Sequence, residues 1–509
     1  MEKILKTNVY FNDTVFSDSI EQAIDADFSL PDYCPDISKI FKCQAVPRIA
    51  SKSINGKTVT IDGVIELTIL YCDKDEKFCS YDYKYPFSKI LEINEEINNA
   101  NILAKICTDY INCRAVNGRK VDIHGACMIS VRVFRKKAVE IISDYDDVNI
   151  QLKRGNTPAT IPMGYAEKYL LVEEEIRIGE SKPQIENVLR YNCVSAVKET
   201  KIINGKAVIK GNLTVSVLYC PKEGNIPQCV KSVIPFSQIL DIEGINDMCE
   251  CESKSEVAFC EIKPKISPMG ENKSFLINAK ILISSKAHCS NDVAVLLDAF
   301  SRKYEAEICK NNICFDKISY NISEIFHTKK TIELDDDISS IVDLWSTTGL
   351  ITTRFENTQM IITGIVTASG IYCNEQGNNI YFEKPIEFEY KYSLDSEPIL
   401  PFCEPQISVE SCSFTILSSN SIEVRFDLLI NASVYERNNV SLISELKVNE
   451  NRPLSKSNRG ALTIYFPSKD ECVWDIARIY NASVDEIMRI NELENEDLIA
   501  GKMILVSVM

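Results

Sequence analysis

The chain has 509 residues, of which 45% are hydrophobic and 25% are charged. A chain of this length exceeds a single hydrophobic core, so we expect three or four domains. The formal net charge of −17 argues against a general nucleic-acid-binding protein, which needs a basic face, and against adsorption to anionic lipid.

The beginning of the chain contains no targeting signal of a familiar kind. Residues 1–13 have no apolar core of signal-peptide length, and they include acidic side chains. No stretch of the sequence reaches the apolar length that spans a bilayer. We therefore expect a protein that has no membrane span and is cytosolic when it is made.

One alternating stretch occurs three times, at 59–72, 207–220 and 360–373, and each copy places Tyr-Cys at the same distance after a glycine. In the first copy, one parity is apolar apart from Gly63, and the other parity holds the polar residues Thr60, Asp62, Glu66 and Thr68. A period of two places each set on its own face of a β-strand. A glycine inside so regular a strand indicates a bulge or a close backbone approach.

Asn55-Gly56 and Asn204-Gly205 precede the first two copies. Asn-Gly accepts positive φ at both turn positions, so each strand is predicted to be the return arm of a hairpin. A shorter stretch with the same alternation lies at 121–131. Corresponding stretches lie later in the chain, at 275–283 and 422–434. The pattern predicts three tandem domains, each with two related β units.

The predicted fold is mainly β, with three tandem antiparallel β-sandwich or barrel-like domains followed by a small β-α-α-β domain. A turn-rich stretch at 154–158 marks the first boundary. A segment rich in Ser, Asn and Pro, without apolar periodicity, is expected to be a mobile linker. The assigned ranges are 1–153, 165–304 and 325–448 for the β domains, 449–461 for the linker and 462–509 for the C-terminal domain.

Residues 30–37 read Leu-Pro-Asp-Tyr-Cys-Pro-Asp-Ile. Each proline also restricts the residue before it, so the two prolines predict a rigid, extended turn. We interpret this segment as a packing corner of the first domain.

The sequence offers few groups that could carry chemistry. The 20 cysteines are interpreted as buried or unreactive thiols, since many, such as Cys127, share the apolar parity of a strand. Cross-linking of exposed thiols in an oxidising assembly remains an alternative. Cys249 with Cys251, and Cys309 with Cys314, lack the two well-spaced pairs that a zinc site needs, so we predict no metal and no cofactor.

The chain has three histidines, and none of them belongs to a recognisable catalytic motif. His124 falls on the outward parity of its strand, and His288 is adjacent to Cys289 rather than spaced from it as a ligand pair. Phosphate-loop, zinc-protease and serine-hydrolase motifs are missing from the sequence. We therefore nominate no catalytic residue and expect a protein that is not an enzyme.

Beyond residue 461 the apolar period changes from two to that of a helix. A short strand is predicted at 462–466, and Ser483 can cap the second of two helices. A turn and a strand close the domain at 498–506. The apolar face of the first helix is formed by Val473, Ile476, Ala477 and Tyr480.

The spacing of Tyr465, Trp474, Asn481, Asn491 and Gly501 within residues 463–509 resembles that of a LysM domain. Such domains usually bind glycans that contain N-acetylglucosamine, between the first strand–helix loop and the second helix–strand loop. The residues that the resemblance and the local sequence make candidates for the partner-binding surface are Asp470, Glu471, Cys472, Val473, Trp474 and Ile499.

Two features favour a protein partner over a glycan. The Gly-Asp-Thr that usually precedes the first LysM helix is replaced by Asp470, Glu471 and Cys472. Residues 463–509 also hold four Lys or Arg and nine Asp or Glu, a balance of −5. For Trp474, packing in the small core and contact with a partner both remain open.

Three tandem β domains with the Leu-Pro-Asp-Tyr-Cys-Pro and Tyr-Cys motifs, followed by one LysM domain, resemble the SipL-type spore coat morphogenetic proteins. The resemblance implies that the LysM domain binds the coat ATPase SpoIVA and that the protein acts in the mother-cell cytoplasm at the forespore surface. A scaffold of this kind, a glycan-binding protein and an enzyme with an unrecognised site remain the three hypotheses.

Overall fold

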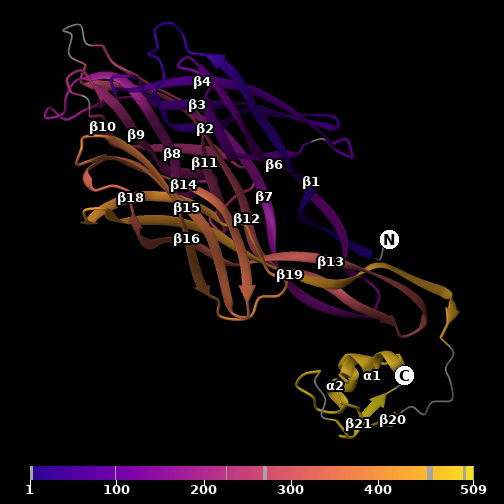
Figure 1. The fold of residues 1–509 in the computed structure, drawn as a ribbon. Coiled ribbons are helices and arrows are strands. Elements are labelled where there is room, and N and C mark those ends of the chain that lie inside the picture. The colour runs from indigo at the N-terminus through magenta and orange to yellow at the C-terminus, as the bar shows by residue number, and fades with distance from the viewer. Residues whose placement is uncertain are drawn as a thin grey trace.

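The computed structural model describes residues 4–97, 99–224, 226–266, 272–454, 462–469, 471–496 and 500–507, without the side chain of Leu350. A long body of strands ends in extended ribbons, and a small domain with two helices lies near the tip of these ribbons (Figure 1). The described strand pairs are antiparallel. The prediction of a mainly β protein with a β-α-α-β domain at its C-terminus is therefore confirmed.

The body consists of three modules that follow one another along the chain. The first comprises β1 (Ile4–Ser29), β2 (Lys39–Asn55), β3 (Thr58–Cys72), β4 (Phe78–Glu92), β5 (Asn101–Ala115) and β6 (Lys120–Tyr145). The second comprises β7 (Ile150–Arg177), β8 (Ile185–Ile203), β9 (Lys206–Pro221), β10 (Gln228–Asp241), β11 (Cys249–Pro264) and β12 (Ser274–Ser301). The third comprises β13 (Tyr304–Glu333), β14 (Ile338–Glu356), β15 (Gln359–Asn374), β16 (Asn379–Ser393), β17 (Phe402–Cys403), β18 (Gln406–Ser418) and β19 (Ser421–Pro453).

Each module packs two sheets against each other. In the first module, a hairpin sheet with the order β2-β3-β4 faces an outer sheet with the order β1-β6-β5. The predicted alternation of 59–72 is confirmed, because alternate residues of β3 are buried. The buried side chains of β3, including Ile61 and Ile65, share one core with those of β6, including Ile123 and Ile129. Burial of these apolar faces is the main stabilising contribution to the module.

The repeated glycine and tyrosine of the hairpin strand have steric and hydrogen-bonding roles. A Cβ atom at Gly63 would overlap both the ring of Phe87 and the carbonyl of Arg48, so the neighbouring strands come closer than any side chain permits. The hydroxyl of Tyr71 donates a 3.1 Å hydrogen bond to the carbonyl of Pro35, and thereby ties the hairpin sheet to the segment 30–37.

The three hairpin sheets pack in a ring. β4 contacts β8, β10 contacts β14, and β16 contacts β2. Each module contributes the residue before its repeated tyrosine to one shared apolar cluster. These residues are Leu70, Leu218 and Ile371. An ion pair between Lys77 and Glu186 crosses one of these joints at 3.0 Å. The body is therefore a closed arrangement of three modules rather than a string of separate domains.

The outer strands continue beyond the sheets as three two-stranded ribbons, which we call the stalk. The stalk comprises residues 4–14 with 134–145, 150–162 with 288–301, and 304–318 with 435–453. Each ribbon begins at a shift of register, next to Val15, Met163 or Ser319, and such bulges bend a strand. The ribbons share an apolar core that includes Val9, Val295, Phe315 and Leu442.

Parts of the ribbons lie where the sequence predicted a boundary and part of a linker. Residues 154–158 lie inside β7, which begins at Ile150, and β13 begins at Tyr304 rather than near residue 325. Residues 449–453 of the predicted linker belong to β19, and residues 455–461 lie outside the described residues. Polar side chains are compatible with strand here, because a narrow ribbon leaves much of its surface in water.

The C-terminal domain comprises β20 (Leu462–Tyr465), α1 (Val473–Tyr480), α2 (Val484–Ile490) and β21 (Ile504–Ser507). Among the described residues, no helix is long and apolar enough to cross a membrane.

Candidate partner-binding surfaces of the C-terminal domain

The two short helices of the C-terminal domain are set by local signals at their ends. The carboxylate of Asp475 accepts a 3.0 Å hydrogen bond from the backbone N–H of Cys472, the residue before α1, and thereby satisfies a donor that the helix leaves free. Asn481 ends α1 in the left-handed conformation, at a φ of 53°. Ser483 occupies the predicted cap position before α2, although its side chain makes no capping hydrogen bond.

The predicted surface residues that precede α1 are engaged within the domain. The Glu471 carboxylate accepts hydrogen bonds from the Tyr465 hydroxyl at 3.0 Å and from the Ser468 N–H at 2.7 Å. The Cys472 thiol donates to Asp475 at 3.1 Å. Val473 is fully buried, whereas Asp470 and Ile499 lie outside the described residues.

Trp474 lies at the joint between the C-terminal domain and the stalk. Its side chain is only 3% exposed, and its ring packs edge-on against Phe300 of β12 at a centroid distance of 5.0 Å. The indole Nε1–H donates a 3.0 Å hydrogen bond to Asp298 of the same strand. The structure thus places Trp474 between two parts of one chain, an arrangement that the sequence did not indicate.

Asp298 accepts from three donors, two on α1 and one on β13. Besides Trp474, it pairs with Arg478 of α1 at 2.8 Å and with Lys310 of β13 at 2.9 Å. Burial raises the pKa of Asp298, but the hydrogen bonds from Lys310 and Trp474 and the charge of Arg478 outweigh this effect and lower it below its ordinary value. The carboxylate is therefore ionised at neutral pH and joins the domain to the stalk.

One face of the small sheet in the C-terminal domain presents large apolar side chains to solvent. Leu462 and Ile464 of β20 are 55% and 56% exposed, and Phe466 and Met503 are 61% and 51% exposed. The opposite face of the sheet, which includes Ile504 and Val506 of β21, packs into the core of the domain. We call Leu462, Ile464, Phe466 and Met503 the exposed apolar face. Sequence reasoning missed it, although the alternation of 462–466 carries the signal.

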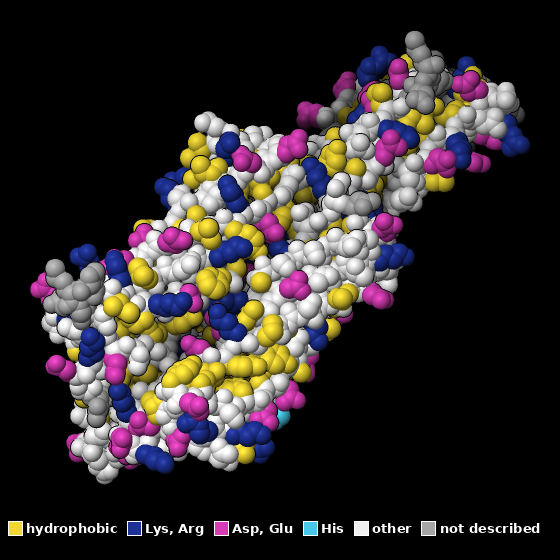
Figure 2. Space-filling model, turned by 90° about the horizontal axis from the view of Figure 1, so that it is seen from above, with side chains coloured by type: hydrophobic (Ala, Val, Ile, Leu, Met, Phe, Trp, Pro, Cys, Tyr) yellow, Lys and Arg dark blue, Asp and Glu magenta, His cyan; other side chains and the backbone are white. Residues whose placement is uncertain are grey.

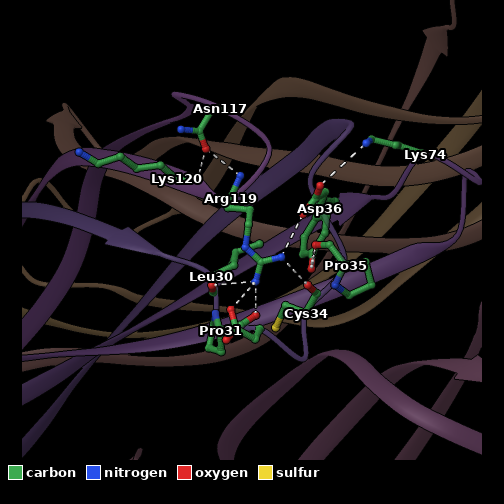
Figure 3. A network of polar contacts seen from close by, with 11 residues as sticks. Leu30, Pro31, Cys34, Pro35, Asp36, Lys74, Asn117, Arg119 and Lys120 are labelled. Atoms are coloured by element: carbon green, nitrogen blue, oxygen red, sulfur yellow. Dashed lines mark hydrogen bonds and ion pairs between the residues drawn. The ribbon is translucent and has the colours of Figure 1, made fainter.

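The proline-rich segment 30–37 of the first module is held by one side chain. Figure 3 shows Arg119 among the carbonyl groups of this segment. Its guanidinium donates to the carbonyls of Pro31 at 2.7 Å and Leu30 at 3.2 Å, and it pairs with Asp36 at 3.0 Å. Leu30 is buried, while Tyr33 is 82% exposed. The segment is therefore a packing corner, as predicted, with an exposed tyrosine at its tip.

A cavity of about 1000 Å³ lies between the modules and is lined mainly by polar groups. Arg132 pairs with Glu404 there, and the Tyr435 hydroxyl donates to Glu252 at 2.8 Å. These pairs join different modules. On the face shown in Figure 2, basic and acidic side chains are interspersed around apolar bands, which does not resemble a nucleic-acid-binding surface.

The cysteines and histidines form no metal site within the described ranges, because no group of three or more potential ligands gathers there. The interpretation of the cysteines as buried or unreactive thiols does not hold for one pair. Cys249 and Cys289 form a disulfide between β11 and β12, because the register of the sheet places them directly opposite each other. His124 is exposed, as its parity predicted.

Two family models match the chain. The model described as SipL, SPOCS domain matches residues 36–116 and 184–265, which cover β2 to β5 of the first module and β8 to β11 of the second. The LysM domain model matches residues 469–507. No curated protein and no solved structure shows significant similarity to the chain. Two segments of the chain are therefore similar to the SPOCS domain of SipL, and the C-terminal segment is similar to a LysM domain.

Proposed function

We propose that this protein is a non-enzymatic scaffold of spore coat assembly whose LysM domain binds the coat ATPase SpoIVA at the forespore surface, on the mother-cell side. The SipL and LysM matches support the general role, since both are families of binding domains. The three modules then act as a rigid body that holds the LysM domain and spaces it from other coat components.

The observation that carries this proposal is the exposed apolar face of a small acidic domain. A surface this small rarely exposes four large apolar side chains to water on one side of a two-stranded sheet. Burial against a protein partner removes this area from water and stabilises the complex by about 25 cal/mol per Å² before the costs of association. The acidic balance of the domain favours a basic surface on the partner.

The predicted residues around Trp474 provide a second part of the proposed surface. Glu471 and Cys472 directly precede α1, and Asp470 comes before them in the sequence, outside the described residues. Because Trp474 itself is covered by the stalk, a partner that contacts the indole must first displace Asp298 and Phe300. The exposed apolar face needs no such rearrangement, so we assign the first encounter with the partner to it.

The test is capture of purified SpoIVA-type ATPase by the full chain, measured by biolayer interferometry. We expect a double variant, Ile464→Ser with Phe466→Ser, to weaken capture by roughly 100-fold, because two apolar anchors are lost. Ile90→Ser is the matched control, since Ile90 is 66% exposed but lies on β4 of the first module. Equal capture by the double variant and the control would contradict the assigned surface.

A glycan-binding function is the second candidate, and the LysM match favours it. Two observations weigh against it. The loop before α1 carries acidic side chains and a thiol in place of Gly-Asp-Thr, and the carboxylate of Glu471 is already hydrogen-bonded to Tyr465 and Ser468. Co-sedimentation of the full chain with peptidoglycan tests this alternative. Sedimentation together with failure to capture the ATPase would replace our proposal with the glycan-binding one.

A further inference from the structure

Two cysteines of the second module meet across the seam between its two sheets. Cys193 belongs to β8 of the hairpin sheet and Cys260 to β11 of the outer sheet. Their Sγ atoms are 2.7 Å apart, and the residues are 67 positions apart in the chain. Cys193 is 6% exposed and Cys260 is 1% exposed. Unlike Cys249 and Cys289, this pair is not bonded.

A cavity of about 280 Å³ between the first and second modules is lined by Cys193. The first module contributes Arg48 and Lys105, and the second contributes Ser195 and Ser255. The guanidinium of Arg48 is fixed by Glu66 at 3.0 Å and by the carbonyl of Val257 at 2.9 Å. The cavity has room for a small polar molecule and several waters.

Some polar groups in the wall of this cavity lack hydrogen-bond partners. The hydroxyl oxygens of Ser195 and Ser255 are buried, and neither has a hydrogen-bond partner among the described residues. A buried hydroxyl without a partner is costly, so a polar guest or water that reaches both groups is favoured. The cavity therefore brings a small hydrogen-bonding molecule to the side of Cys193.

We propose that Cys193 and Cys260 form a redox modification site, in which a small hydroperoxide enters this cavity, oxidises Cys193 and leaves the two cysteines joined by a disulfide. The neighbouring hydroxyls of Ser195 and Ser255 would hold the peroxide oxygens next to the sulfur. The resulting bond would link the hairpin sheet to the outer sheet of the second module.

The reaction proceeds in two steps. The Cys193 thiol loses its proton to solvent, and its sulfur attacks one peroxide oxygen. The S–O bond forms as the O–O bond breaks, and the leaving oxygen takes a proton to become an alcohol, or water in the case of hydrogen peroxide. The Cys260 sulfur then attacks the Cys193 sulfur. The S–S bond forms as the S–O bond breaks, and the released hydroxide leaves as water with the Cys260 proton. Two thiols lose two electrons and the peroxide gains them.

The surroundings of Cys193 disfavour its thiolate form. The hydrogen bond with Cys260 and burial both raise the pKa of Cys193, and the charge of Arg48 opposes them only in part. Because the thiolate is the reacting form, the oxidation is expected to become faster as the pH rises. The charged or titratable groups near the pair include Arg48, Glu66, Lys52, Lys105, Tyr169, Tyr191 and Glu256.

The third module provides an internal control. Cys412 of β18 lies close to Ser346 of β14, whose hydroxyl partly opposes the effect of burial on the pKa of Cys412. Ser346 pairs with Ala368, and Cys412 pairs with Phe426, at the same seam between a hairpin sheet and an outer sheet. A hydroxyl cannot form a disulfide, so this seam keeps its thiol under the conditions that oxidise the second module.

The test uses the full chain with Cys249→Ser and Cys289→Ser, so that exchange with the existing disulfide cannot occur. The protein is treated with hydrogen peroxide at pH 8, quenched with an alkylating agent and mapped by peptide mass spectrometry. We expect a crosslinked peptide pair that contains Cys193 and Cys260 and is two hydrogens lighter, with Cys412 alkylated. The unfolding midpoint is expected to rise by roughly 5 °C.

Cys193→Ser is the matched variant, since serine keeps the size of the side chain and removes the bond. We expect this variant to show no crosslink and no rise in the midpoint after peroxide, with an unchanged circular dichroism spectrum before it. Recovery of Cys193 and Cys260 as separate alkylated or sulfinic peptides in the treated Cys249→Ser, Cys289→Ser protein would overturn the proposal. Crosslinking of Cys193 to any other cysteine would overturn it as well.

Discussion

The indole N–H of Trp474 donates a 3.0 Å hydrogen bond to the carboxylate of Asp298, which lies 176 residues earlier in the chain. This bond fastens the LysM domain to the stalk of the second module. A backbone hydrogen bond from the N–H of Val484 to the side chain of Gln151, at 3.3 Å, adds a second point of attachment. The buried carboxylate is the centre of the joint, because Lys310 and Arg478 also depend on it.

Asp298→Ala is expected to release the LysM domain from the stalk. Removal of the carboxylate leaves the indole N–H and two cations without their acceptor, which weakens the joint by roughly 2–3 kcal/mol. In a Trp345→Phe background, Trp474 is the only tryptophan of the chain. We therefore expect its emission maximum to shift to longer wavelength, as the indole becomes exposed to water.

The control for this variant is Asp292→Ala, which removes an exposed carboxylate from the same strand, β12. It is expected to leave the emission maximum in place. Emission from Asp298→Ala that equals that of the control would show that the joint does not depend on the carboxylate.

The same joint is expected to weaken in acid. The pKa of Asp298 is lowered from an ordinary value of 3.8, so the carboxylate stabilises the joint fully above that value. This contribution is lost as the pH falls below about 4 through the lowered pKa. In the Trp345→Phe background we expect a reversible red shift of Trp474 emission in that range. Asp298→Asn, which does not titrate, is expected to show no such transition, and a transition of equal size in this variant would refute the assignment.

Much of the architecture could be predicted from local pattern. The alternation of 59–72 identified a strand with one buried face, because a period of two has a single geometric interpretation in a sheet. The structure gives the repeated glycine a reason, since the ring of Phe87 occupies the space above Gly63. The LysM domain was equally recognisable, because its helices are short and their apolar faces, such as Val473 with Ile476, are set by local spacing.

The sequence could not predict which surfaces meet. Lys42 of β2 pairs with Glu383 of β16, 341 residues later, and nothing in the spacing of these residues indicates that the modules close into a ring. The same limitation applies to Trp474, whose partners Asp298 and Phe300 lie in a segment that was assigned to the second β domain. The disulfide between Cys249 and Cys289 was missed because it depends on the register between β11 and β12, which composition does not determine.

Trp474→Glu is expected to abolish capture of the ATPase partner. The new carboxylate would face Asp298 in a buried site, and the packing against Phe300 would be lost, at a cost of about 3–5 kcal/mol. Calorimetric unfolding of the full chain separates loss of the domain fold from loss of its surface. Trp474→Phe keeps the ring contact and removes only the N–H, so we expect it to retain most of the binding. Wild-type affinity in Trp474→Glu would contradict a role for this region in recognition.

Gly63→Ala is expected to destabilise the first module although it adds only one methyl group. The new Cβ would overlap the Phe87 ring and the Arg48 carbonyl, so the hairpin sheet must shift or the ring must leave its site, at a cost of about 1–3 kcal/mol. Urea unfolding followed by circular dichroism would measure this loss. Gly118→Ala is the control in the same module, since its Cβ would meet nothing closer than 3.5 Å. Equal midpoints for the two variants would show that close strand approach is not the reason for glycine at this position.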